Sequence, residues 1–162
     1  MGGQSVLIDD FDRGYVDVDD LLGSDDTSFE LNLLHFLTER AAVRNYERRI
    51  GTRFSDAEFD RAHAAGIAAE TEYLRSVIGD ATIRFNHERT ENGRAIFVFR
   101  SRDPFRYEIV HVFGRSRRGL STGTVFALRG NRRLTIPELI AERAGALAPA
   151  APPQAAPVPA VP

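Results

Sequence analysis

The chain has 162 residues, 43% of them hydrophobic, and a formal net charge of −2, so it is long and apolar enough for one globular domain. It contains no cysteine, which excludes disulfides, thiolate metal ligands and cysteine nucleophiles. Its apolar runs are far shorter than the roughly 18 residues of a membrane helix, and its start lacks the order of a secretion signal. We therefore expect no membrane contact, and a protein that is cytoplasmic or exported by a system independent of signal peptides.

Charge is divided unevenly along the chain, and all 21 basic residues are arginine. The first 80 residues hold 8 arginines and 17 acidic residues, whereas the remaining 82 hold 13 arginines and 6 acidic residues. Several arginines gather in two predicted loops, where they could bind an anion or a nucleic acid. These candidates are Arg115, Arg117, Arg118, Arg129, Arg132 and Arg133. The nearby phenylalanines have the spacing of residues that fill a strand core rather than stack on bases, so nucleic-acid binding is not favoured. We expect a protein partner.

Composition divides the chain into three parts. Residues 1–26 predict an extended lead-in or hairpin that turns at Asp12-Arg13-Gly14, followed by an acidic stretch that fails the EF-hand pattern and indicates a solvated loop. Residues 27–147 predict the folded domain. Residues 148–162 consist almost entirely of proline and alanine, and indicate a tail or linker.

Two helices are predicted near the start of the domain. A capping box at Thr27 to Glu30 predicts a helix that continues to Ile50, and a second box at Ser55 to Glu58 predicts a helix that ends near Gly79. The link between them is short, so the helices should lie antiparallel.

Period-two patterns then predict four strands. Ile83, Phe85 and His87 alternate with polar residues, and Asn92-Gly93 predicts a type I′ turn into the strand 95–100. Further strands are expected at 105–113 and 121–129, and Thr135 to Glu138 caps a last short helix. The predicted fold is α+β, with an antiparallel helix pair on a four-stranded antiparallel sheet and a short C-terminal helix.

Helical spacing places imidazoles and carboxylates on the inner faces of the helix pair. His35 and Glu39 share one stripe of the first helix, and His63 and Glu70 share the apolar stripe of the second. Closing the helical hairpin brings the four together, with Gly66 allowing close approach. This layer predicts a structural polar network, a zinc or iron site with two nitrogen and two oxygen ligands, or acid–base chemistry without a metal.

The stretch LNLLHFLTERAAVRNYERRIG, followed by FDRAHAAGIAAE, resembles the helical pair of zincin-like core domains of polymorphic toxins and of cargo of extracellular contractile injection systems. In that family a His-Glu-x-x-His helix binds zinc and its Glu is the general base. His35 matches the first ligand, whereas Phe36 occupies the position of the base and Glu39 that of the second His. The resemblance implies a degenerate, non-proteolytic metallopeptidase relative, in which Glu70 stands for the downstream acidic ligand and His63 has no counterpart.

These observations lead to three functional expectations. The first is a non-enzymatic bacterial accessory or interaction domain, a degenerate zincin-like module of a secretion or toxin system with the His/Glu layer as an internal brace. The second is a metal-dependent hydrolase that uses His35, Glu39, His63 and Glu70. The third is an anion or nucleic-acid binder that uses the arginine loops.

Overall fold

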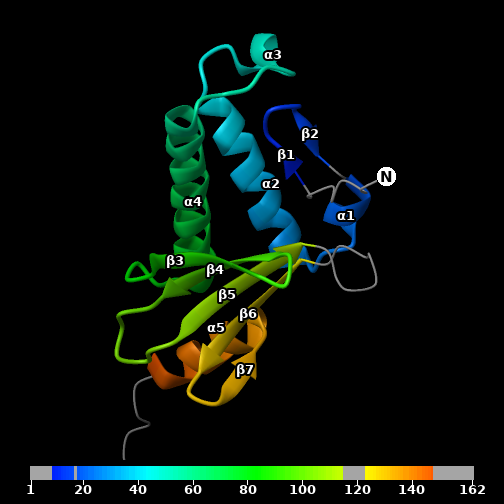
Figure 1. Ribbon diagram of the computed structural model, residues 1–162. Helices are drawn as coiled ribbons and strands as arrows, with labels where there is room; N and C mark the ends of the chain where they lie inside the picture. Colours follow the sequence, from blue (N-terminus) through cyan, green and yellow to red (C-terminus); the bar gives the residue numbers. More distant parts are fainter. Residues whose placement is uncertain (1–8, 17, 115–122, 148–162) are drawn as a thin grey trace, which may run out of the picture.

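The computed structural model describes residues 9–16, 18–114 and 123–147 of the chain, so the predicted tail at 148–162 lies outside the described residues. The elements are β1 (Asp9–Asp10), β2 (Tyr15–Val16), α1 (Val18–Leu22), α2 (Asp26–Ala41), α3 (Tyr46–Arg49), α4 (Asp56–Ile78), β3 (Arg84–Glu91), β4 (Arg94–Arg100), β5 (Glu108–Gly114), β6 (Thr124–Arg129), β7 (Arg132–Leu134) and α5 (Ile136–Leu147). The α+β fold is confirmed: α2 and α4 pack on an antiparallel sheet, and α5 closes the domain (Figure 1). None of the described helices is long and apolar enough to cross a membrane.

The lead-in forms the expected hairpin, with β1 paired antiparallel to β2. The acidic stretch that follows was predicted as a solvated loop, and this prediction is wrong in part because Val18–Leu22 forms the short helix α1. Leu21 supplies the reason, since it is buried against Phe36 of α2 and so ties this segment to the domain.

The two long helices begin at different kinds of cap. At α2, the side chain of Asp25 accepts a hydrogen bond from the Ser28 amide, so Asp25 is the N-cap. The predicted capping box, which placed the N-cap at Thr27, is wrong by two residues. At α4, the predicted Ser55–Glu58 capping box is present, and Gly79 ends the helix in the left-handed conformation, with φ 70°.

Helix α2 ends at Ala41, not at Ile50 as predicted. Asn45 takes a left-handed conformation, with φ 55°, which turns the chain before the short helix α3. This turn lets the Tyr46 ring stack on Phe54, 5.5 Å between centroids, while its hydroxyl donates to the Phe11 carbonyl. Packing of these three aromatic residues therefore outweighs the helical preference of the segment.

The sheet is a meander in the order β3-β4-β5-β6-β7, with every neighbouring pair antiparallel. The type I′ turn is confirmed by positive φ at Asn92 and Gly93. Strand β7 is a fifth strand beyond the predicted four, three residues long and too short to show alternation in the sequence. The third predicted strand starts late, at Glu108, because the Asp103 side chain accepts the amides of Phe105 and Arg106 in a turn.

A β-bulge in β3 reverses the predicted alternation. The register with β4 shifts between Phe85 and His87, so His87 is exposed and Glu88 faces the helix pair. The prediction that His87 shares the inner face with Phe85 is therefore wrong.

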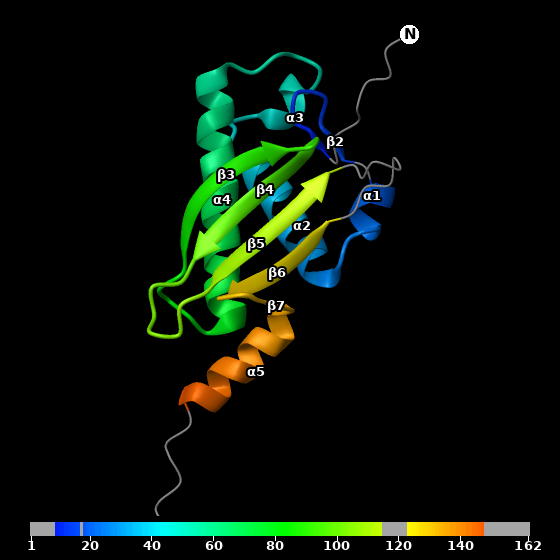
Figure 2. The same ribbon diagram turned by 60° about the horizontal axis from the view of Figure 1, so that its bottom comes forward.

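The main core lies between the sheet and the two long helices, which cover the same face of the sheet (Figure 2). Its largest fully buried apolar side chains are Leu31, Leu74, Ile83, Phe97, Phe99, Ile109 and Leu139. A smaller cluster on the opposite face includes Ile96, Val98 and Val110. Burial of the first set fixes the helices on the sheet and brings α2 and α4 into contact above β4 and β5.

Below the end of α4, a buried carboxylate anchors the β4–β5 connection. Asp80 accepts hydrogen bonds from the hydroxyls of Thr82, Ser101 and Tyr107, at 2.7, 2.7 and 2.6 Å. Burial by itself would raise the pKa of Asp80, but these hydrogen bonds outweigh it and lower the pKa to about 2.

Asp80 should therefore contribute to stability only when it is ionised. Its folded pKa lies below the ordinary value of 3.8, so the contribution is present above about pH 4 and is lost as the pH falls toward 2. Urea unfolding of the wild type should lose about 2 kcal/mol between pH 5 and pH 2 that the Asp80→Asn variant does not lose. Equal pH dependence of the two proteins would contradict this role.

Candidate metal centre

Three side chains from the helix pair meet at one point. His35 and Glu39 come from α2, and His63 comes from α4. Glu39 Oε1 lies 2.9 Å from His35 Nε2 and 2.8 Å from His63 Nδ1, and the two nitrogens are 3.1 Å apart. These three atoms form a nearly equilateral triangle, which we call the triad. His35 and Glu39 are buried, whereas the side chain of His63 is 22% exposed.

Local sequence explains this convergence. The four-residue spacing of His35 and Glu39 places both on the inner face of α2. Gly66 of α4 lies directly opposite, and a Cβ atom there would be 2.8 Å from Nε2 of the His35 ring. The absence of a side chain at position 66 therefore gives the imidazole its place between the helices.

The other nitrogen of each triad imidazole contacts a carboxylate outside the triad. His35 Nδ1 lies 3.2 Å from Glu70 Oε1, and His63 Nε2 lies 2.9 Å from Glu88 Oε2. Carboxylates in these positions fix the orientation and tautomer of imidazoles that bind metal ions. Each ring is thus held so that its remaining nitrogen points toward Glu39.

A buried polar chain continues from Glu70 into the sheet. His111 of β5 is fully buried, with Nδ1 3.7 Å from Glu70 Oε1 and Nε2 3.0 Å from the Ser28 hydroxyl. Asn32 in turn donates to Ser28. Burial lowers the pKa of His111 to about 3, aided by the charge of His35, so this imidazole is neutral.

Electrostatics make the triad attractive to positive charge. Burial by itself would lower the pKa of His35, but hydrogen bonds to Glu39 and Glu70 outweigh it and raise the pKa to about 10. Burial would likewise raise the pKa of Glu39, but hydrogen bonds from both triad imidazoles lower it to about 2. The Glu39 hydrogen bond raises the pKa of His63 as well. The carboxylates therefore favour a cation at this point, whether a proton or a metal ion.

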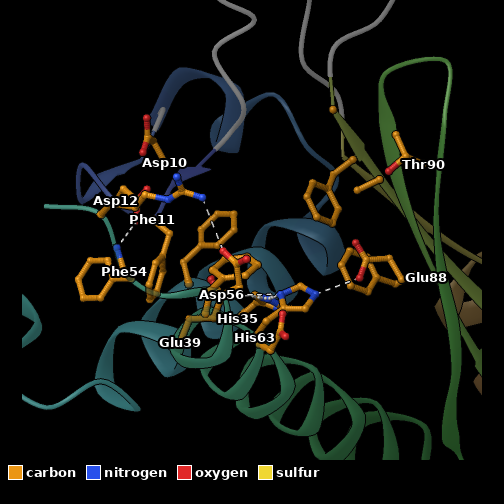
Figure 3. Close-up of a pocket in the computed structure, with 18 of the residues that line it drawn as sticks. Asp10, Phe11, Asp12, His35, Glu39, Phe54, Asp56, His63, Glu88 and Thr90 are labelled. Atoms are coloured by element: carbon orange, nitrogen blue, oxygen red, sulfur yellow. Dashed lines mark hydrogen bonds and ion pairs between the residues drawn. The ribbon is translucent and has the colours of Figure 1, made fainter. Parts of the chain in front are cut away.

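The triad residues line a cavity of about 700 Å³. Figure 3 shows His63 between Glu39 and Glu88, with Asp10, Asp12 and Phe54 on the side of the N-terminal hairpin and Thr90 on the side of the sheet. Since all three triad residues line this cavity, a metal ion bound there would have an open side.

The four residues that the sequence predicted as one layer do lie together, but in unequal positions. His35, Glu39 and His63 form the triad, while Glu70 contacts the far side of the His35 ring. Of the predicted anion-binding residues, Arg129 and Arg132 both pair with Glu142 of α5, and Arg133 lies over the Phe126 ring. Arg115, Arg117 and Arg118 lie outside the described residues.

Sequence reasoning missed two residues of the site. Strict alternation with Ile83, Phe85 and His87 would place Glu88 on the outer face of β3, and no residue in the sequence signals the bulge. His111 was not among the candidate site residues, although its period-two spacing with Ile109 and Phe113 indicates the inner face, where it is fully buried.

Comparisons with protein-family models, with curated proteins and with solved structures found no match.

Proposed function

We propose that this domain is a mononuclear metal-dependent hydrolase whose metal ligands are His35 Nε2, Glu39 Oε1 and His63 Nδ1. The observation that carries the proposal is the triad itself, three potential ligand atoms with mutual distances of 2.8 to 3.1 Å. Tetrahedral zinc with nitrogen and oxygen ligands at 2.0–2.1 Å would separate these atoms by about 3.3 Å, so little movement is needed.

Hydrogen bonds alone cannot join all three pairs of triad atoms at the same time. One N–H group cannot point at two corners of a triangle, so at most two of its three edges can be hydrogen bonds. If both imidazoles donate to Glu39 Oε1, their two nitrogens lie 3.1 Å apart with no hydrogen bond between them. A divalent cation held by His35, Glu39 and His63 would interact with all three atoms at once.

The number of ligands favours catalysis over a purely structural metal. Structural zinc sites are closed by four protein ligands, whereas catalytic sites have three and leave one position for water or substrate. Two imidazoles and one carboxylate match the catalytic set, and the cavity lies on the open side. Zinc in such a site acts as a Lewis acid and lowers the pKa of a bound water to about 7.

The internal brace is the second candidate, and the raised pKa of His35 favours it. A protonated His35 can donate to both Glu39 and Glu70, which satisfies a buried charge without any metal. Under this proposal the domain is a non-enzymatic accessory module, in line with the resemblance to degenerate zincin-like domains.

Elemental analysis of protein purified without a histidine tag distinguishes the two candidates. We expect about one equivalent of zinc or iron per chain, removed by a chelator and restored on dialysis against the metal. His63→Ala should abolish the retention of metal, and its partly exposed side chain can be removed without opening the core. The matched control is His87→Ala, because His87 is an exposed imidazole on β3 that contacts Asn86 and Arg89.

Activity provides the second part of this test. The metal-loaded wild type should hydrolyse a general ester probe such as 4-nitrophenyl acetate faster than the chelated protein, and His63→Ala should eliminate the difference. If the metal-free wild type binds no added zinc and its hydrolysis of the ester does not depend on metal, the hydrolase proposal is excluded and the internal-brace proposal is supported.

A further inference from the structure

The cavity beside the triad combines aromatic walls with a negative rim. Its aromatic lining residues are Phe11, Phe36, Phe54, Phe59, Phe97 and Phe113. Within the described part of the chain, six carboxylate residues also line it, including the triad ligand Glu39, together with one guanidinium, that of Arg53. A divalent ion on the triad would offset two of these negative charges, so the described lining residues would together remain negative.

Phe59 connects the aromatic wall with the triad. Its ring is stacked on His63, 5.5 Å between centroids with an interplanar angle of 13°, and the residue is 39% exposed. Phe11 contacts it edge-on, 5.4 Å between centroids, and packs in the same way on Phe54. An open aromatic surface next to a ligand imidazole suits an apolar group of a bound molecule, and aromatic faces also attract organic cations.

The carboxylates at the rim are not used equally by the fold. Asp12 accepts the Phe54 amide, and Asp56 lies in the first turn of α4, 3.8 Å from Arg53, where it also complements the helix dipole. Asp60 lies one turn further along α4 and has no hydrogen bond or ion pair within the described part of the chain. Its charge is therefore available to a molecule in the cavity.

We infer that the cavity binds an organic cation: an amine with an apolar or aromatic body that places an oxygen donor on the triad metal. The aromatic wall contacts the body, and Asp60 and Asp56 attract the ammonium group. This inference rests on the proposed function for the metal contact, whereas the preference for positive charge depends on the cavity alone.

A series of hydroxamates tests the inference on zinc-loaded protein. Calorimetry would compare benzohydroxamic acid with its 4-aminomethyl and 4-carboxy derivatives, which share the metal-binding group and differ in charge. At low ionic strength we expect the ammonium derivative to bind at least about tenfold more tightly than the carboxylate derivative. Equal binding, or tighter binding of the carboxylate derivative, would overturn the inference.

Two variants locate the source of the preference. Asp60→Asn should reduce the ratio between the two derivatives at least about threefold, because it removes one unpaired negative charge from the rim. Glu72→Gln is the matched control, since Glu72 is an exposed acidic residue of the same helix outside the cavity. An unchanged ratio in the double variant D56N/D60N would show that these residues do not select the ligand.

A metal-free arm separates this inference from the proposed hydrolase. Saturation-transfer NMR on chelated protein would compare phenethylammonium with 3-phenylpropanoate, neither of which needs zinc. Selective saturation of the ammonium probe in a protein that binds no zinc would support the cavity preference and reject the metal site. Zinc binding without any preference for the ammonium probes would support the metal site and reject the cavity preference for organic cations.

Discussion

Replacing Glu70 by alanine should destabilise the metal-free protein by about 3–5 kcal/mol, the cost of removing one partner from a buried ion pair. The side chain of Glu70 is 0% exposed, and it is the carboxylate nearest to both His35 Nδ1 and His111 Nδ1. Its loss leaves Nδ1 of the buried His35 ring without its carboxylate partner and opens a cavity between the helices. Urea unfolding in the presence of a chelator measures the effect without a contribution from metal.

Glu88→Ala provides the matched control, because it removes the carboxylate that contacts the other triad imidazole. The side chain of Glu88 is 38% exposed, so the change should cost no more than about 1 kcal/mol. Glu70→Gln retains an acceptor for His35 and should be milder than alanine, yet it should weaken zinc binding about 10- to 100-fold. Similar stabilities for the alanine variants at positions 70 and 88 would contradict the central position of Glu70.

Gly66→Ala should destabilise the protein by about 1–3 kcal/mol, although alanine is the better helix former. The new Cβ atom would lie 2.8 to 2.9 Å from three atoms of the His35 ring, which is buried and held by Glu39 and Glu70. Either the ring moves or the helices separate. Both responses displace Nε2, so we also expect zinc affinity to fall at least about tenfold.

The same substitution at Gly145 of α5 should have the opposite sign. A Cβ atom there would meet nothing within 4 Å, and alanine at this helical position should stabilise the protein by up to about 1 kcal/mol. Thermal unfolding of the two variants beside the wild type measures both effects. Equal stabilisation by the two substitutions would mean that Gly66 does not provide space for His35.

The helix pair and its polar layer could be predicted because helical spacing is regular. Placing His35 and Glu39 on one stripe needs only the period of the helix, and the capping box at Ser55 determines where α4 begins. The contact between His35 and Glu70 then depends on the hairpin closing, and α2 and α4 do pack together although the link between them, residues 42–55, is longer than predicted. For these residues local preference and tertiary structure agree.

The strand residues of the site could not be predicted equally well, because they depend on contacts distant in sequence. The bulge after Phe85 moves Glu88 from one face of β3 to the other, and it is determined by pairing with β4. The early end of α2 depends in the same way on Tyr46 reaching Phe11 and Phe54. Neither event has a local sequence signature.

The order of the strands also has a kinetic consequence. Each strand of the meander pairs with its neighbour in the chain, and only the short helix α3 lies between the two long helices, so most contacts join nearby segments. Low contact order of this kind predicts rapid folding. The hydrogen bond between Ser28 and His111 joins residues 83 positions apart in the sequence. It should therefore form after the local hairpins have closed.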